Sequence, residues 1–345
     1  MVYSFELIQH ANIRFREAVC RLSRCELLCM LRTFGFEPEI HEEMLGGLPF
    51  LTFESRALSA EELIRLRRLS SVSLMAERHG DMLSPVSVSS PFLLPEDLPE
   101  VLKYKGKTSV PFTRMMINTA LSLVPGGMFR NDIVLMDPLC GKGTSLFCAL
   151  QHGMDAIGMD LDRRAVHEAE EYFSRYLKLH RVKHSVKARS ETLGKQSVPV
   201  TEFSFSGSKE QLSRGETQHL LLSVGDTEQI PALVRRKPVH LIVADLPYGV
   251  QHAPQSDRQP ESFVSLLKRA LPVWARALSP GGALALSFNT YTLPTRTLVQ
   301  MIRQVGLIPC LDPPFDALSH QIEQAVLRDV VFAKKHEGGL KYDFE

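Results

Sequence analysis

The residues best suited to chemistry stand at 245–249, where the sequence reads Asp-Leu-Pro-Tyr-Gly. The apolar residues just before them, 241–244, form a short run typical of a strand buried on both faces. Proline and glycine end that strand directly after the carboxylate. An acid, a proline and an aromatic ring at the carboxyl end of a buried strand lie where open α/β sheets bind ligands. A strand followed by a plain turn would look the same, so the interpretation depends on the rest of the chain.

The segment 137–144, Asp-Pro-Leu-Cys-Gly-Lys-Gly-Thr, carries a second set of such residues. It joins a predicted strand at 133–136 to a predicted helix at 145–151, as at the start of a Rossmann-like unit, where glycine lets the backbone approach a ligand. Its glycine spacing differs from that of dinucleotide-binding and phosphate-binding loops. Asp137 would repel a pyrophosphate, so a positively charged ligand fits better. S-adenosylmethionine, with its sulfonium and ammonium groups, is such a ligand.

Two further predicted strands also end in an acid. The strand at 156–159 is followed by Asp160, about where such folds place the carboxylate that binds ribose hydroxyls. A surface aspartate at a turn would look the same, but the spacing favours the ligand-binding interpretation. The strand at 220–224 is followed by Gly225 and Asp226, at the position that faces the adenine amino group in this fold. We therefore predict a row of cofactor-binding carboxylates.

An α/β sheet is needed to position these residues. The chain has 345 residues, enough for two domains or for one large α/β domain with an appendage. Strand and helix patterns predict a Rossmann-like domain at 103–345, with a mostly parallel seven-stranded sheet closed by an antiparallel strand at 325–333. A polar stretch at about 185–217 is predicted to be an insertion, a hairpin outside the core sheet.

Residues 1–80 predict a small α+β auxiliary domain. Two capping-box pairs, Ser23 with Glu26 and Ser59 with Glu62, predict the starts of its helices. The segment 81–102 contains prolines with serines between them and is predicted to be a linker. Strands are expected at 2–8, 48–53 and 71–77.

The composition and the cysteine spacing indicate an ordinary soluble protein without a predicted membrane span, metal site or disulfide. The formal net charge is +1, and 44% of the residues are hydrophobic and 23% charged, as in an ordinary soluble protein. No run approaches the ~18 to 20 apolar residues of a membrane span, and the first residues lack the pattern of a signal peptide, so a cytoplasmic location is expected. The six cysteines have no Cys-x-x-Cys spacing, so we predict no metal site and no disulfide.

Basic residues gather at two places that suit contacts with RNA. Lys103, Lys105 and Lys107 flank a tyrosine at the start of the predicted α/β domain. Arg181 and Lys183 belong to a basic run after a predicted helix. A solvated linker, or a helix end whose charges suit the macrodipole, would look the same. We predict RNA contacts at these five residues.

These motifs together resemble a known family. The segments 137–144 and 245–249 are similar to the two motifs of class I, S-adenosylmethionine-dependent methyltransferases that act on exocyclic amino groups. The stretch 105–114, with Lys-Gly-Lys-Thr and Phe-Thr-Arg, resembles the approach to the catalytic domain in the tRNA guanine-N2 methyltransferases, relatives of THUMP-containing enzymes. The resemblance covers about residues 100 to 335. This chain has Leu246 where the family most often has proline, and Lys142 where it favours serine.

The resemblance implies an activity and a set of site residues. It implies methyl transfer from S-adenosylmethionine to an exocyclic amino group of a nucleobase in RNA, with guanosine N2 in tRNA as the expected target. The implied catalytic residues are Asp245, Leu246, Pro247 and Tyr248; the carboxylate and the Leu246 carbonyl would accept the two N–H groups of the amine. The implied cofactor-binding residues are Thr113, Asp137, Pro138, Cys140, Gly141, Gly143, Thr144, Asp160, Leu161, Asp226, Thr227 and Asp245.

Two other classes of function stay open on the sequence. A DNA methyltransferase acting on the amino groups of adenine or cytosine would carry the same motif, although no target-recognition domain is evident. A nonenzymatic RNA-binding module that keeps a vestigial methyltransferase fold is the second alternative. Intact Asp137, Gly141, Gly143, Asp245 and Tyr248 argue against such decay.

Overall fold

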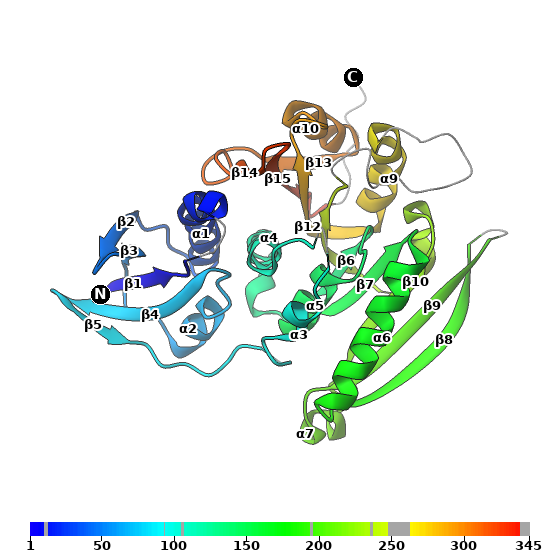
Figure 1. Cartoon of the computed structure of the whole chain (residues 1–345), viewed down its shortest axis with the longest axis horizontal. Helices are drawn as coiled ribbons and strands as arrows, with labels where there is room; N and C mark the ends of the chain where they lie inside the picture. The colour runs from blue at the N-terminus through cyan, green and yellow to red at the C-terminus, as the bar shows by residue number, and fades with distance from the viewer. Residues whose placement is uncertain are drawn as a thin grey trace.

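The computed structural model describes residues 1–9, 13–92, 94–104, 107–193, 196–234, 237–247 and 263–338. In that part of the chain two β-sheets carry helices packed against them (Figure 1). An antiparallel sheet forms an N-terminal unit at one end of the molecule. The rest of the chain forms a larger α/β unit.

The N-terminal unit is built on an antiparallel sheet of order β2-β3-β1-β4-β5. Tyr3, Phe5 and Leu7 alternate along β1 and are all buried, as expected for one face of a strand. The apolar side of a long helix, α1, packs against this face. The elements are β1 (Val2–Leu7), α1 (Ile13–Thr33), β2 (Ile40–Leu45), β3 (Leu48–Glu54), α2 (Ala60–Leu66), β4 (Val72–His79) and β5 (Met82–Pro85).

The start of the first helix differs from the prediction. Helix α1 begins at Ile13, so Ser23 and Glu26 lie inside it and do not cap it. Glu26 is fully buried and accepts hydrogen bonds from the hydroxyl of Ser70 and from the side-chain amide of Asn118. A carboxylate used in such a tertiary contact leaves the same spacing in the sequence as a capping box.

Other features of this unit follow the sequence more closely. Ser59 and Glu62 form a capping box at the start of α2, as predicted, and β1, β3 and β4 lie where strands are expected. The sequence pattern does not predict β2. Strand β5 lies inside the segment 81–102 that we predicted as a linker, and it pairs with β4 at the edge of the sheet, where its proline is tolerated.

The large sheet has a parallel centre. Strands β10, β7, β6, β11 and β12 lie side by side in parallel, and β15 pairs antiparallel with β12 and β13. This parallel α/β arrangement is the Rossmann-like fold class expected from the sequence. Its strands are β6 (Val134–Asp137), β7 (Asp155–Asp160), β8 (Lys183–Leu193), β9 (Gln196–Ser206), β10 (Gln218–Val224), β11 (Val239–Asp245), β12 (Leu278–Asn289), β13 (Leu307–Cys310), β14 (His320–Glu323) and β15 (Val326–Lys335).

The sheet is wider than the seven strands predicted. Strands β8 and β9 form a hairpin that continues the sheet, because β9 pairs antiparallel with β10. With β14 beside β15, the sheet has ten strands in the described part of the chain. The hairpin therefore belongs to the core sheet, contrary to the prediction for 185–217. Its polar composition hides four buried apolar residues on β9, namely Val198, Val200, Phe203 and Phe205.

Apolar side chains form a core on each face of the large sheet. Along β6, Leu135 faces the core that contains residues of α4, α5 and α6, whereas Val134 and Met136 face the core that contains residues of α8, α9 and α10. The helices are α3 (Leu98–Val101), α4 (Val110–Leu123), α5 (Thr144–Gln151), α6 (Arg163–Leu179), α7 (Lys209–Ser213), α8 (Pro231–Val234), α9 (Phe263–Ala277) and α10 (Thr295–Gln304), with 3-10 turns η1 (Gly127–Phe129) and η2 (Thr227–Gln229).

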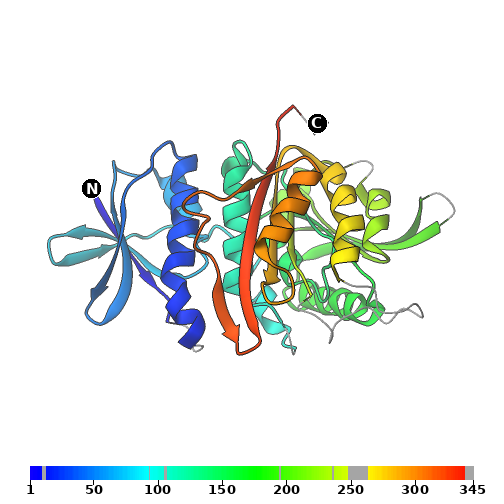
Figure 2. The ribbon, with the colours of Figure 1, turned by 90° about the horizontal axis from the view of Figure 1, so that it is seen from above.

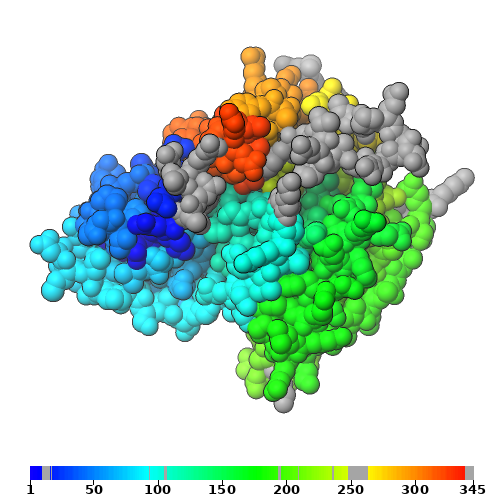
Figure 3. Space-filling model, in the orientation of Figure 1, coloured from blue at the N-terminus to red at the C-terminus, as the bar shows by residue number. Residues whose placement is uncertain are grey.

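The two units share one hydrophobic core. Apolar residues of α1 and of α4 belong to the same buried cluster, and the two helices pack on each other between the sheets (Figure 2). The segment after β5 crosses the surface towards α6 (Figure 3). There, Tyr172 and Tyr176 of α6 donate hydrogen bonds to the Leu98 carbonyl and to Asp97. Among the helices described, none is both long and apolar enough to span a membrane.

Candidate functional site

The carboxyl ends of the parallel strands bring the predicted acids to one edge of the sheet. Asp137 ends β6, Asp160 ends β7 and Asp245 ends β11. Asp226 follows β10 and begins the turn η2. This edge is where open α/β sheets bind their ligands.

Asp245 is held by hydroxyl groups on both carboxylate oxygens. The Thr108 hydroxyl donates to Oδ2, and the Ser287 hydroxyl donates to Oδ1 over 2.7 Å. Ser287 lies directly opposite Asp245 in the parallel pairing of β11 with β12. The Asp245 side chain remains 24% exposed, so a ligand can reach it. Donors on both oxygens orient the carboxylate before any substrate binds.

A buried cation stands next to this carboxylate. Arg328 Nη2 lies 3.7 Å from Asp245 Oδ2, and the Arg328 side chain is 6% exposed. The guanidinium carbon lies 4.8 Å from the ring centroid of Phe112, whose ring contacts His320 edge-on. Burial shields this charge from salt, so its interaction with Asp245 persists at physiological ionic strength.

Asp137 lies beneath the glycine loop and is 4% exposed. The Ser145 hydroxyl donates to its Oδ2, and the Leu139 backbone N–H donates to its Oδ1 over 3.0 Å. Burial raises the pKa of Asp137 to about 7 against the effect of these hydrogen bonds, and the carboxylates of Asp160 and Asp245 raise it further. Because the acids repel one another here, a cationic ligand would be stabilised at this edge.

Asp160 ties the loop to the end of β7. Its Oδ2 accepts the backbone N–H of Gly141 over 2.7 Å, and its Oδ1 accepts that of Asp162 over 2.8 Å. Gly141 has φ +48°, in the left-handed region that favours glycine. Burial raises the pKa of Asp160 as well.

The loop packs closely on β7 through Cys140. A Cβ atom on Gly158 would lie 2.4 Å from Leu146 Cδ1 and 2.9 Å from Cys140 Sγ. The Cys140 backbone N–H donates to the Met159 carbonyl over 3.1 Å. Pro138 and Cys140 are buried, so they support the loop from the interior of the protein.

Tyr104 and Lys142 border the other side of the loop. The hydroxyls of Tyr104 and Thr144 are 2.9 Å apart. Lys142 Nζ lies 5.0 Å from the Tyr104 ring centroid and forms an ion pair with Glu168. Gly143, with φ +83°, starts α5. Lys142 is therefore held by neighbours within this chain.

The predicted cofactor-binding residues near the end of β10 differ in burial. Asp226 Oδ1 accepts the Glu228 backbone N–H over 3.0 Å. Leu161 is 45% exposed and offers an apolar surface next to Asp160. Thr227 is 3% exposed and accepts the Trp274 indole N–H over 2.8 Å, so its side chain connects η2 to α9.

Thr113 and Lys107 both make hydrogen bonds within the chain. Thr113 is buried in α4, where its hydroxyl donates to the Ser109 carbonyl over 3.1 Å. The Lys107 ammonium donates to the Pro99 carbonyl at the start of α3.

The other residues that we predicted to be catalytic or to contact RNA lie in different surroundings. Leu246 is buried and its backbone N–H donates to the Ser287 carbonyl, while Pro247 is half-buried. Tyr248 and Lys105 lie outside the described residues, and Lys103 is exposed. Arg181 and Lys183 are exposed after α6, whose 17 residues carry them about 25 Å from its start near Asp160.

Sequence reasoning missed three residues that contact Asp245. Thr108 belongs to the Lys-Gly-Lys-Thr segment that carries the family resemblance, which was a usable signal. Ser287 lies near the end of a predicted strand, but its partner follows only from the pairing of β11 with β12. Arg328 lies on the antiparallel strand β15, and nothing in the sequence relates it to the site.

In the part of the chain that the structure describes, no group of three or more His, Cys, Asp or Glu side chains could hold a metal ion. The six cysteines are free thiols. The chemical resources of the edge are its carboxylates, hydroxyls and backbone groups.

Several solved structures are similar to this chain at low sequence identity and low TM-score. No protein-family model and no curated protein sequence matches the chain. TrmN from Thermus thermophilus is 16% identical over 86% of this chain, with a TM-score of 0.40, and this chain spans 60% of its length. An rRNA methylase from Streptococcus thermophilus is 12% identical, covering 64% of this chain and 95% of its own (TM-score 0.36). A TehB-like SAM-dependent methyltransferase from Corynebacterium glutamicum is 17% identical, with 60% and 82% covered (TM-score 0.34).

Proposed function

We propose that this protein transfers a methyl group from S-adenosylmethionine to an exocyclic amino group of a nucleobase in RNA. The position of Asp245 and the hydrogen bonds to its carboxylate carry the proposal. Asp245 ends a central parallel strand, and Thr108 and Ser287 hold both of its oxygens beside the acidic edge of the sheet.

The residues at this edge fit S-adenosylmethionine, which supplies an electrophilic methyl group when bound. Mutual repulsion of Asp137, Asp160 and Asp245 favours a ligand with positive charges. Asp160 stands where a carboxylate can bind ribose hydroxyls. The exposed Leu161 offers an apolar surface for adenine, and the backbone at Gly141 has open space beside it.

The proposed chemistry rests on orientation more than on a strong base. The lone pair of an exocyclic amine is delocalised into the ring, so the amine is a poor nucleophile. The Asp245 carboxylate and the Leu246 carbonyl would accept its two N–H groups and direct the lone pair at the methyl group. Acceptors that match the positive charge developing on nitrogen stabilise the transition state more than the ground state. Asp245 would then take the released proton.

The finer identity of the substrate is also part of the proposal. The sequence resemblance points to guanosine N2 in tRNA. Such a base must leave its helix to reach the edge, and Pro247 would stiffen the loop that receives it. Stacking on Tyr248 would contribute about 1 to 3 kcal/mol.

Labelled S-adenosylmethionine with bulk tRNA, rRNA and DNA in parallel reactions tests this function. We expect incorporation into tRNA, with the product nucleoside identified by mass spectrometry. The Asp245→Ala variant should lose methyl transfer while its affinity for S-adenosylmethionine, measured by calorimetry, stays within about threefold.

Asp316→Ala serves as the matched control, because it removes an exposed aspartate on the loop before β14 and should leave activity unchanged. An active Asp245→Ala enzyme would contradict the catalytic role. Methylation of DNA alone would redirect the proposal to a DNA amino methyltransferase, and binding of RNA without any transfer would support a nonenzymatic module.

A further inference from the structure

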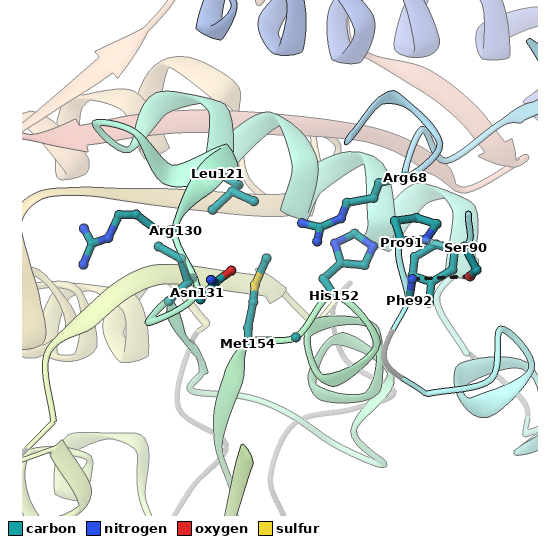
Figure 4. Close-up of a pocket in the computed structure, with 11 residues that line it drawn as sticks. Arg68, Ser90, Pro91, Phe92, Leu121, Arg130, Asn131, His152 and Met154 are labelled. Carbon is teal, nitrogen blue, oxygen red and sulfur yellow. Dashed lines mark hydrogen bonds between the residues drawn. The ribbon is translucent and has the colours of Figure 1, made fainter. Parts of the chain in front are cut away.

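A cavity of about 290 Å³ (Figure 4) lies at the amino ends of β6 and β7. Asp245, by contrast, lies at the carboxyl end of β11. Ile133 and Met154, which precede β6 and β7, form part of its wall. Arg68, from the turn after α2, and Phe92, from the segment that joins the two units, line it as well. Residues of both units therefore form the wall of this cavity.

Two buried polar side chains meet in this cavity with unsatisfied atoms. His152 is 4% exposed, and neither of its ring nitrogens has a hydrogen-bond partner. Arg68 is 8% exposed and its Nε has no partner either. Figure 4 shows the Arg68 guanidinium next to the His152 ring. Burial of a polar group without a partner costs free energy, and burial of an unpaired charge costs more.

The surroundings of these two side chains are positively charged. Burial lowers the pKa of His152 well below its usual range, and the charges of Arg68 and Arg114 lower it further, so the ring is neutral. Burial lowers the pKa of Arg68 to about 10, which leaves its guanidinium charged at neutral pH. Arg130 lines the far side, where it pairs with the exposed Asp132. None of the described residues that line the cavity is acidic.

The backbone and the rings around the cavity are held in place. The Arg68 carbonyl accepts the side-chain amide of Asn118 over 2.8 Å. The ring of Phe92 stacks on His152 with centroids 5.3 Å apart, and Arg114 lies over the Phe92 ring at 5.0 Å. Backbone N–H groups of His152, Gly153 and Met154 donate to carbonyls in the last turn of α5, which holds the backbone at His152 in place. These contacts present the two groups in fixed positions, which lowers the cost of ordering them on binding.

We propose that this cavity binds a phosphate group between the Arg68 guanidinium and the N–H of the neutral His152 ring. A guanidinium matches the geometry of a phosphate, and a buried pair of this kind would satisfy both side chains. The volume suits a phosphate with a small part of its carrier. The carrier is either a small phosphorylated molecule or the phosphorylated end of an RNA, because both offer the same group.

Titration of the full-length protein with inorganic phosphate, followed by calorimetry, tests the proposal. We expect the wild type to bind and Arg68→Met to bind at least about tenfold more weakly, which corresponds to about 1.4 kcal/mol. Arg67→Met is the matched control, since it removes the neighbouring, partly exposed arginine and should bind as the wild type does. Arg68→Met should also melt at a higher temperature than the wild type in phosphate-free buffer, because it removes an unpaired buried charge.

Competition with short RNAs then separates the two carriers. Displacement of phosphate by a 5′-phosphorylated oligoribonucleotide, but not by the same oligomer with a 5′-hydroxyl, identifies an RNA end. Displacement by neither oligomer identifies a small phosphorylated molecule, and equal displacement by both overturns the proposed recognition of a terminal phosphate. Absence of phosphate binding by the wild type, or equal binding by Arg68→Met, overturns the proposal. If Arg68→Met does not fold, NMR spectra of the wild type replace the comparison of variants. The backbone amide resonances of His152 and Gly153 must then shift when phosphate is added, and unchanged resonances overturn the proposal.

Discussion

Asp245 receives hydrogen bonds from Thr108 and Ser287, which stand 137 and 42 positions away in the sequence. The carboxylate therefore has one preferred orientation at the exposed edge of the sheet. An enzyme that works by directing an amine lone pair needs this orientation more than it needs basicity. At the scale of single residues, the hydroxyl of Thr108 is thus as much a part of the proposed machinery as the motif that contains Asp245.

Replacing Thr108 with valine removes one donor to Asp245 and nearly preserves side-chain volume. We expect kcat for methyl transfer to fall about 10- to 100-fold, because a small misplacement of a reacting group has an effect of that size. Affinity for S-adenosylmethionine should stay within about threefold. Steady-state kinetics and calorimetry measure the two quantities.

Thr33→Val is the control for this variant. It removes a hydroxyl that donates to the Met30 carbonyl in α1, at a distance from the proposed site. A normal kcat in Thr108→Val would show that Ser287 and Arg328 orient Asp245 without it.

The glycine loop depends on the strand beside it. Gly158 lies in the middle of β7, where Leu146 of α5 and Cys140 of the loop fill the space that a side chain would need. The strand, the loop and the following helix therefore pack as one piece. The Gly141 backbone N–H donates to Asp160. The positions of these two residues therefore follow from that packing.

Gly158→Ala tests this dependence between elements. The added methyl group should destabilise the protein by about 1 to 3 kcal/mol, as overpacking in a dense core does, and should weaken binding of S-adenosylmethionine. Denaturant unfolding and calorimetry measure the two effects. In a double-mutant cycle the same change should cost less in a Leu146→Ala background, and strictly additive costs would contradict a direct clash.

The whole molecule behaves as two units joined through a buried polar network. Glu26 of α1 accepts hydrogen bonds from Asn118 of α4 and from Ser70, and the Asn118 amide also reaches the Arg68 carbonyl. Burial raises the pKa of Glu26 from 4.5 to about 7, against the effect of these hydrogen bonds. Protonation of this residue is therefore linked to folding of the complete chain.

Stability should fall as the pH rises through about 7. The folded protein holds a proton on Glu26 between pH 4.5 and about 7 that the unfolded chain has released, so this contribution is complete at low pH and lost above 7. We expect Glu26→Gln to remove up to about 3 kcal/mol of the difference in unfolding free energy between pH 5 and pH 8. Urea unfolding at the two pH values measures it.

Glu62→Gln is the matched control for the pH experiment. The hydrogen bond from Arg56 lowers the pKa of Glu62 to about 2, so its contribution is present above pH 4.5 and is lost only on further acidification. Between pH 5 and pH 8 this variant should show the same pH dependence as the wild type. An unchanged pH dependence in Glu26→Gln would rule out Glu26 as the linked group.

The sequence by itself determined the fold class, the loop that contains Asp137 and the segment that begins at Asp245, for which we propose the catalytic role. These follow from local patterns, namely apolar runs that end in an acid followed by glycine or proline. Only the tertiary structure decided that Thr108, Ser287 and Arg328 surround Asp245, that β8 and β9 widen the sheet, that Glu26 is buried, and that Arg68 meets His152. Each of these depends on strand pairing or packing between segments far apart in the chain, and a buried tertiary contact leaves no periodic signal in the sequence around it.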